Sequence, residues 1–257
     1  MNLPQFKKKT YEINLLRNLY QMRFGKLGLI YKLEDLNRGY YKKVLQTGDV
    51  ELEHQIGRLT CFKDILNYIS RKKVKGDIIE FGTWKGYSLL WISYLVERFR
   101  IFDKKIVGID CFEGLPFSEV PFKKGGFSNT SIKECKNNIF RSDLLYDITK
   151  KNIFIEKYLF SNKRGILKKL KSLNIAKLCF VHIDSDLSSS FNEVMDILID
   201  GKLMSSCCFI LIDDYGSNLN LSRAVDNKIK SLGSRWKVRL YSKTLLTRNY
   251  EFIRRKK

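Results

Sequence analysis

The stretch "KLCFVHIDSDLSSS", residues 177–190, places two carboxylates, Asp184 and Asp186, directly after an apolar run. The run is short and apolar, as expected of a strand that is buried on both faces. Such a strand needs a helical layer on each side, which predicts an α/β fold. In folds of this class, ligands bind at the carboxyl edge of the sheet, so the two acids fall where a site is expected.

Strand-like and helix-like runs alternate along the chain. The runs with strand character are 77–82, 105–110, 152–158, 177–184, 206–214, 236–242 and 244–255. The runs with helical character are 58–73, 87–100, 131–140, 164–173, 189–203 and 221–232. This order predicts an α/β protein with a doubly wound, mostly parallel, seven-stranded Rossmann-like sheet.

The N-terminal residues differ from this alternating pattern. Apolar residues recur at three- and four-residue intervals in "YEINLLRNLYQMRF" (11–24), which predicts an amphipathic helix. We therefore expect a helical N-terminal extension over 1–57 and the main domain over 58–257. The apolar faces of the extension could pack a homodimer or a higher homo-oligomer.

The formal net charge is +21, and two interpretations of it stay open. One is a polyanionic partner such as nucleic acid. The other is a lysine-rich composition inherited from an AT-rich genome, because Lys, Asn, Ile and Phe are abundant throughout. The basic residues are spread along the chain, which favours the second interpretation, so no nucleic acid partner is expected.

The cysteines and the apolar runs bear on the cellular compartment. The six cysteines form no CxxC pair and have no histidine at zinc-site spacing, so we expect reduced thiols and a cytoplasmic location. The N-terminus lacks the apolar region of a signal peptide. No apolar stretch approaches the roughly 18–20 residues that span a bilayer, so no transmembrane segment is expected.

Acids or glycine end each predicted central strand. Glu80 and Gly82 end the first, Asp110 the second, Asp184 and Asp186 the fourth, and Asp213 and Asp214 the fifth. A buried acid is costly unless it is paired or binds a cation, so the set indicates a binding site at one edge of the sheet. For Asp186 alone, a helix N-cap is an equally good interpretation.

The first strand-to-helix turn reads "EFGTWKG" (80–86). Gly82 and Gly86 allow the backbone to approach a ligand at the start of a helix. The turn is neither a GxGxxG nor a P-loop, which argues against a pyrophosphate. Asp110 lies where a carboxylate usually holds ribose hydroxyls. These features fit S-adenosylmethionine, with Glu80 on its amino group and Asp110 on its ribose.

Four motifs carry a family resemblance: "IIEFGTWKG", "GIDCFEGLP", "VHIDSDLSSS" and "ILIDDYG". In their order and spacing the chain resembles the macrocin/mycinamicin O-methyltransferase family (TylF/MycF-like) over about residues 50–253. Members of that family are class I enzymes that use S-adenosylmethionine and a divalent metal, usually magnesium, to methylate sugar hydroxyls. The resemblance implies a methyltransferase domain over 58–257.

The resemblance also implies roles for individual positions. The methionine part of the cofactor would be lined by Glu80, Phe81, Gly82, Thr83 and Trp84. Its ribose and adenine would be surrounded by Asp110, Cys111, Phe112, Glu113 and Gly114, with Ser131 nearby. The metal ligands would be Asp184, Asp213 and Asp214, and oxygen ligands of this kind select Mg²⁺ or Mn²⁺. The family pattern D-x-D-L-Y-E-S is "DSDLSSS" here, so Ser188 and Ser189 replace two residues that face the substrate.

The general base stays open between neighbouring residues. Asp184 is the candidate that the resemblance favours. His182 precedes it by two and so points to the same side of the strand, as a second candidate base or as a hydrogen-bonded partner. A packed, hydrogen-bonded histidine is the favoured interpretation of His182. His54 could cap the active site, but it is interpreted as incidental. "PFKKGGF" (121–127) is either a loop that closes over substrate or a solvated connector.

The hypothesis for function is an S-adenosylmethionine- and Mg²⁺-dependent sugar O-methyltransferase. We expect a sugar of a bacterial surface polysaccharide, capsule or lipopolysaccharide, or its nucleotide-linked precursor. A catechol-type O-methyltransferase of another diol is an alternative, although Leu187 stands where that group has a lysine. A nucleic-acid methyltransferase is disfavoured because "HIDSD" replaces the [DN]PP[YF] motif. A basic binding protein whose acids are only helix caps is the alternative from another class.

Overall fold

The computed structural model describes residues 50–142, 144–216, 218–244 and 246–255. The predicted helix over 11–24, and the rest of the predicted extension up to residue 49, lie outside the described residues. From Val50 one continuous helix, α4 (Val50–Lys72), runs across the boundary predicted at residue 57. Residues 54–57 therefore belong to the same helix as the start of the predicted main domain.

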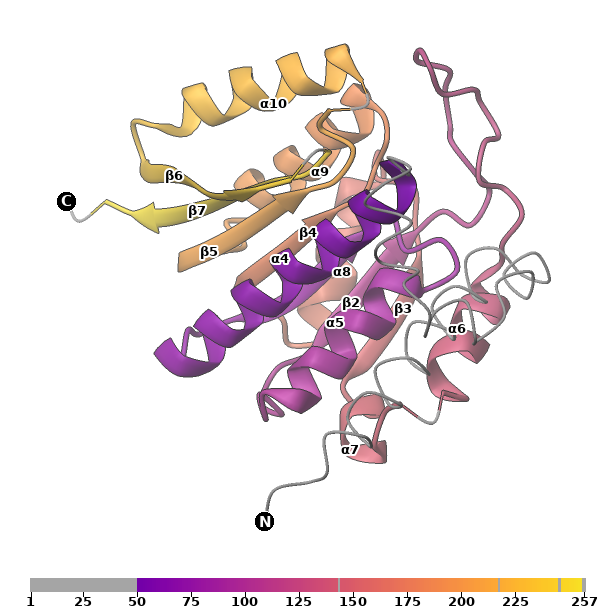
Figure 1. Cartoon of the computed structure of the whole chain (residues 1–257), viewed down its shortest axis with the longest axis vertical. Coiled ribbons are helices and arrows are strands. Elements are labelled where there is room, and N and C mark those ends of the chain that lie inside the picture. Colours follow the sequence, from indigo (N-terminus) through magenta and orange to yellow (C-terminus); the bar gives the residue numbers. More distant parts are fainter. Residues whose placement is uncertain (1–49, 143, 217, 245, 256–257) are drawn as a thin grey trace, which may run out of the picture.

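The sheet has seven strands in the order β3-β2-β1-β4-β5-β7-β6, which confirms the predicted fold (Figure 1). The strands are β1 (Asp77–Phe81), β2 (Ile106–Asp110), β3 (Ile153–Lys157), β4 (Leu178–Ile183), β5 (Met204–Ile212), β6 (Trp236–Lys243) and β7 (Arg248–Arg254). The first five are parallel, and β7 pairs antiparallel with both β5 and β6. The carboxyl ends of β1, β2, β4 and β5 therefore meet at one edge.

Helices cover both faces of this sheet (Figure 1). They are α5 (Tyr87–Arg98), α6 (Ile132–Phe140), α7 (Asp147–Lys150), α8 (Lys163–Ser172), α9 (Ser188–Asp200) and α10 (Leu219–Leu232). α4 and α5 lie side by side on one face, and α8 and α9 on the other. Only the one-turn α7 has no counterpart in the predicted helices. None of the described helices is both long and apolar enough to span a bilayer.

The side chains of each strand alternate between these two layers. Ile78 of β1 and Phe180 of β4 pack in the apolar cluster that contains Phe62 of α4, whereas Val181 packs in the cluster on the α8–α9 face. Residues two positions farther along a strand point to the same side. Glu80 therefore points toward α4, and so does His182. This alternation places the polar strand ends beneath the first turns of α4.

Candidate active site

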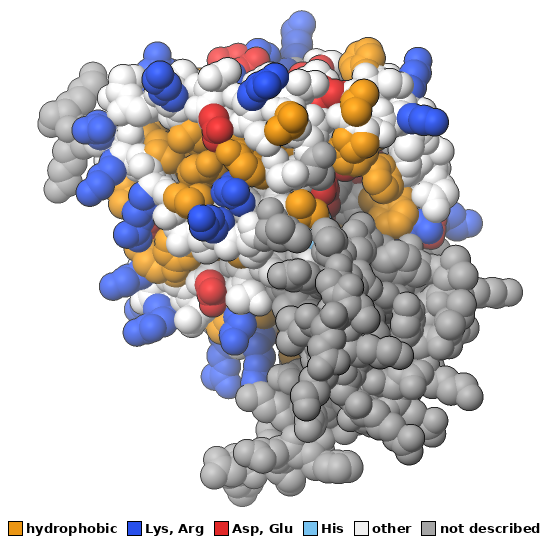
Figure 2. Space-filling view, turned by 45° about the horizontal axis from the view of Figure 1, so that its top comes forward, with side chains coloured by type: hydrophobic (Ala, Val, Ile, Leu, Met, Phe, Trp, Pro, Cys, Tyr) orange, Lys and Arg blue, Asp and Glu red, His pale blue; other side chains and the backbone are white. Residues whose placement is uncertain are grey.

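A pocket of about 440 Å³ opens at the carboxyl edge of the sheet. Its size falls within the range of about 300–1,000 Å³ that is common for small-molecule sites. Much of its wall is aromatic, from Trp84, Phe117, Phe122, Phe127, Tyr158 and Phe160. Five carboxyl side chains also line it, those of Asp110, Asp184, Asp186, Glu193 and Asp214. Figure 2 shows hydrophobic side chains gathered in patches on one face of the molecule, with Lys and Arg side chains scattered around them.

Five of the predicted cofactor residues line this pocket: Gly82, Trp84, Asp110, Cys111 and Gly114. Asp110 accepts hydrogen bonds from the backbone N–H groups of Trp84 (2.7 Å) and Phe112 (2.6 Å). These bonds hold the carboxylate in place at the carboxyl end of β2. They also connect the turn that follows β1 to the turn that follows β2. Burial raises the pKa of Asp110, partly offset by these two backbone donors.

The other predicted cofactor residues lie elsewhere. Glu80, Phe81, Thr83 and Phe112 are buried and are not among the described residues that line the pocket. Glu113 is exposed and forms an ion pair with Lys157 (2.7 Å). Ser131 is the N-cap of α6, where its hydroxyl accepts a hydrogen bond from the Glu134 N–H (3.0 Å). The structure thus gives Ser131 a structural task and leaves Glu113 at the surface.

The glycines of the first turn are needed for packing between protein segments. Gly82 has a φ of +91°, and a Cβ there would lie 1.7 Å from the carbonyl oxygen of Asp184. Gly86 has a φ of +85°, and its Cβ would press on Ile139 and Cys135 of α6. Gly82 still borders the pocket, but its close backbone neighbour is the end of β4. The sequence predicted that glycine is needed at these two positions so that the backbone can approach a ligand. In the structure, glycine is needed there because other protein segments pack against the backbone.

The carboxylates of Asp184, Asp186 and Asp214 form a cluster. One oxygen from each lies within 4.8 Å of the others. Asp186 and Asp214 have left-handed backbones, with φ values of 56° and 55°. Asp186 is not a helix cap, because the N-cap of α9 is Leu187. Burial, followed by the charge of Asp213, raises the pKa of Asp184 to about 7 and that of Asp214 to about 8.

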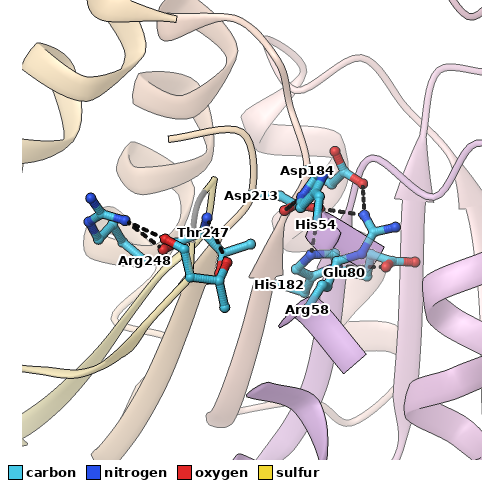
Figure 3. Close-up of polar contacts among 9 residues, drawn as sticks. His54, Arg58, Glu80, His182, Asp184, Asp213, Thr247 and Arg248 are labelled. Atoms are coloured by element: carbon cyan, nitrogen blue, oxygen red, sulfur yellow. Dashed lines mark hydrogen bonds and ion pairs between the residues drawn. The ribbon is translucent and has the colours of Figure 1, made fainter. Parts of the chain in front are cut away.

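Asp213 belongs to a second, buried cluster (Figure 3). Its oxygens meet His54 Nε2 at 2.5 Å and the Arg58 guanidinium, and His182 Nε2 lies 3.7 Å away. His182 Nδ1 in turn lies 2.8 Å from Glu80 Oε1. Arg58 also donates to Asp184 Oδ2 at 3.1 Å. The predicted metal set is thus divided between two groups that could hold an ion: Asp213 with His182 and Asp184, and Asp214 with Asp184 and Asp186.

The buried cluster is held by opposite charges. Burial alone would raise the pKa of Asp213, but Arg58 and His54 outweigh it and hold that pKa well below the usual range. Burial alone would lower the pKa of His182, but Asp213 and Glu80 raise it to about 9. His182 is also fully buried, with its Nδ1 at 2.8 Å from Glu80 Oε1. Such a group serves as a hydrogen-bonded partner behind the acids, as the favoured interpretation states, and is poorly placed to act as a base.

The interpretation of His54 as incidental was wrong, and Arg58 was not singled out at all. Both lie on α4, and both are almost fully buried against the ends of β4 and β5. A sequence signal existed, because His54, Arg58 and Phe62 are each four residues apart and so share one helix face. Starting the predicted helix at residue 58 removed the first member of this series.

A loop on the other side of the pocket is anchored by Glu119. Its carboxylate accepts from the Ser188 N–H (3.0 Å), the Ser188 hydroxyl (2.6 Å) and Asn218 Nδ2 (2.6 Å). Glu119 therefore supplies the cap that Leu187 cannot provide to α9, with a negative charge at the positive end of the helix. The predicted closing loop 121–127 begins just after this anchor, and its movement stays a prediction.

Comparisons with known proteins show the family of the chain. The family model of the macrocin O-methyltransferases (TylF) matches residues 54–231. The chain belongs to the macrocin O-methyltransferase (TylF) family. It is therefore an S-adenosylmethionine-dependent O-methyltransferase, as the sequence predicted. The match begins at His54, so it includes the α4 residues of the buried cluster.

Solved structures of O-methyltransferases have a similar fold. The O-methyltransferase NovP is 19% identical, with a TM-score of 0.62, over 77% of this chain and 81% of that one. The calicheamicin methyltransferase CalS11 is 16% identical, with a TM-score of 0.61, over 99% of this chain and 94% of that one. A search of the curated proteins gave no match.

Proposed function

We propose that this TylF-family enzyme transfers the methyl group of S-adenosylmethionine to a sugar hydroxyl held over Asp184, Asp186 and Asp214. The observation that carries the proposal is the meeting of two features in one pocket. Asp110 and the turn after β1 form one wall of the pocket, and the carboxylates of Asp184, Asp186 and Asp214 lie in the same pocket. Aromatic walls with a few convergent polar groups suit a ligand that has both apolar faces and hydroxyls, as sugars do.

The donor set fits a magnesium ion. Mg²⁺ prefers oxygen ligands and keeps several water molecules, so two or three carboxylates are enough to hold it. Asp184, Asp186 and Asp214 supply these oxygens from within 4.8 Å of one another. Asp213, the third member of the set predicted from the family resemblance, is 1% exposed and already meets Arg58, His54 and His182. We therefore propose Asp186 as a ligand in its place.

The residues of the chain divide the chemical work between them. Bound S-adenosylmethionine supplies a methyl group on a positively charged sulfur, and Mg²⁺ lowers the pKa of a hydroxyl that it coordinates. Asp184 borders the pocket and is the carboxylate placed to accept the hydroxyl proton as the O–CH₃ bond forms and the S–CH₃ bond breaks. Arg58 holds the Asp184 carboxylate in a fixed position, and the Trp84 N–H does the same for Asp110. Holding the base and the cofactor-binding group in place is a large part of catalysis by proximity.

We further propose an acceptor from bacterial surface-polysaccharide synthesis, either a capsule or lipopolysaccharide sugar or its nucleotide-linked precursor. CalS11, which shares the fold, is described as a TDP-rhamnose 3′-O-methyltransferase, which supports a sugar acceptor. The AT-rich-type composition supports a bacterial surface glycan. All six cysteines lie in the described part of the chain and are free thiols, which supports a cytoplasmic location.

Calorimetric titration tests this function. S-adenosylmethionine and then Mg²⁺ would be titrated into the wild type, Asp110→Asn and Asp214→Asn. Loss of a charged hydrogen-bond partner should weaken cofactor binding by Asp110→Asn about 10- to 100-fold. Asp214→Asn should keep the cofactor affinity and lose Mg²⁺ binding.

Asp103→Asn is the matched control, because Asp103 is exposed in the turn before β2, at the opposite edge of the sheet. This variant should match the wild type in both titrations. Failure of the wild type to bind S-adenosylmethionine would reject the proposed function. Cofactor binding with no Mg²⁺ binding would leave a methyltransferase without the proposed metal. Transfer of labelled methyl groups to a panel of nucleotide sugars and capsule fragments would then identify the acceptor.

A further inference from the structure

Arg58 lies between two of the acids (Figure 3). One guanidinium nitrogen donates to both Asp184 Oδ2, at 3.1 Å, and Asp213 Oδ2. The acids follow neighbouring strands, because β4 and β5 are paired and Ile183 lies opposite Ile212. The arginine comes from the face of α4 that packs over those strands. A single cation from the first described helix therefore joins two strand ends that are distant from it in sequence.

The burial of Arg58 sets this contact apart from a surface ion pair. Its side chain is 1% exposed, that of Asp213 is fully buried, and that of Asp184 is 21% exposed. Removing one partner of a buried ion pair leaves an uncompensated charge, which costs several kcal/mol, whereas surface pairs contribute about 0–1 kcal/mol. Arg58 is thus a fixed positive charge within the acid group.

The position of Arg58 gives the acids a closed side and an open side. On the closed side, Asp213 meets His54, Arg58 and His182, and it is not among the described residues that line the pocket. On the open side, Asp184, Asp186 and Asp214 line the pocket. Asp184 belongs to both sides, with Oδ2 toward Arg58.

We propose that Arg58 is a positioning residue: a tethered cation that takes the place between Asp184 and Asp213 and confines a divalent ion to the open side. The inference rests on the proposed function, because it concerns the same methyl-transfer site. The positive charge of the guanidinium has two effects. It lowers the affinity of the site for a divalent ion. It also fixes the position of the Asp184 carboxylate and keeps the ion away from Asp213.

The test is Mn²⁺ binding to the full chain, followed by electron paramagnetic resonance and calorimetry. In Arg58→Gln, we expect Mn²⁺ to bind at least about tenfold more tightly, or a second Mn²⁺ to bind, because a nearby positive charge is removed from a poorly solvated site. Arg58→Lys keeps the charge and should stay within about threefold of the wild type. A purely structural role for Arg58 predicts the opposite sign, since a loosened site binds metal more weakly.

Arg71→Gln is the matched control, because Arg71 is an exposed arginine in the last turn of the same helix. Unchanged Mn²⁺ affinity is expected there. Unchanged or weaker Mn²⁺ binding in Arg58→Gln would overturn the inference, as would the absence of Mn²⁺ binding in both the wild type and this variant. Binding only in Arg58→Gln would also overturn it, because the wild type would then hold no ion on the open side. Titration of S-adenosylmethionine into the same samples separates these outcomes from failure of the methyltransferase proposal itself.

A measurement on the wild type keeps the inference testable if Arg58→Gln does not fold. Anomalous diffraction from crystals soaked in Mn²⁺ would locate the ion directly. We expect it beside Asp184, Asp186 and Asp214, with Arg58 still between Asp184 and Asp213. An ion in contact with Asp213, or an Arg58 side chain displaced by the ion, would overturn the inference.

Discussion

At the scale of single residues, Gly82 shows how closely the end of β1 is packed against the end of β4. The Asp184 N–H donates to the Phe81 carbonyl at 2.8 Å, and the carbonyl of Asp184 occupies the space that a side chain at residue 82 would need. The same contact places the proposed base next to the cofactor turn. A change at Gly82 therefore acts on stability and on the site together.

Gly82→Ala should lower the free energy of unfolding by about 3 kcal/mol or more. The reason is a strained left-handed backbone combined with overpacking against a carbonyl group that is fixed in the sheet. Gly125→Ala is the control, because Gly125 has a φ of +78° but no atom near its Cβ position, and about 1–2 kcal/mol is expected there. Urea unfolding followed by circular dichroism measures both. Equal losses would contradict the role given to the Asp184 carbonyl.

The sequence predicted residues that stand at strand ends better than residues that reach the site from elsewhere. Asp184 and Asp214 were predicted because an acid that follows an apolar run is visible in one short stretch. His54 lies 159 residues from Asp213 along the chain, and this contact depends on how α4 crosses the sheet. The division between Asp213 and Asp214 depends on the backbone turn after β5. Neither the His54–Asp213 contact nor the division between Asp213 and Asp214 can be predicted from a short stretch of sequence.

At the scale of elements, the loop before residue 121 and the start of α9 form one unit through Glu119. The first turn of α9 has no side-chain cap of its own, since its N-cap is Leu187. Glu119 meets that turn and also Asn218, which caps α10. One carboxylate thus links the loop on one side of the pocket to the helices on the other.

Glu119→Ala should increase amide hydrogen exchange in residues 115–127 about fivefold, which corresponds to a loss of about 1 kcal/mol of local stability. Exchange at the Ser188 amide should increase as well, because it loses its acceptor. Glu113→Ala is the control. Glu113 lies just before residue 115, and its side chain forms an exposed ion pair with Lys157 of β3. Mass spectrometry of peptides from both variants measures the effect. Unchanged exchange in Glu119→Ala would show that the anchor does not hold the loop.

The strands and most helices were predictable because their patterns are local. Apolar runs predicted all seven strands, and helical spacing predicted α5, α6, α8, α9 and α10 to within a few residues. α7 is a single turn and is too short for a periodic pattern. The sequence divided α4 between residues 57 and 58, into the predicted helical extension and the next predicted helix, because polar His54 and Arg58 occupy the buried face, where the pattern requires apolar residues. Their burial has an electrostatic cause that hydrophobic periodicity does not detect.

At the scale of the whole molecule, a large positive charge surrounds an acidic pocket. The net charge is +21, and the Lys and Arg side chains are scattered over the face in Figure 2 rather than gathered in one patch. Scattered like charges repel one another and destabilise the compact state. On this face of the described structure they do not form the continuous stripe that nucleic acid recognition uses. This face therefore gives no support to the basic binding protein as an alternative.

The melting temperature should rise by several degrees between 20 and 300 mM sodium chloride, because salt screens the repulsion among surface lysines. Differential scanning fluorimetry measures this. Sodium sulfate at matched ionic strength controls for specific ion effects. A melting temperature that falls with sodium chloride would show that favourable ion pairs outweigh the net repulsion.

The left-handed backbones of Asp186 and Asp214 restrict how this site can change over generations. Asp and Asn occupy that conformation far more readily than most other residues with a side chain, whereas longer or branched side chains are strained there. Asp and Asn codons differ by one base, so a single mutation removes the charge and leaves the backbone intact. Descendants of this enzyme should therefore lose or regain the proposed metal affinity in one step, while the architecture around the pocket persists.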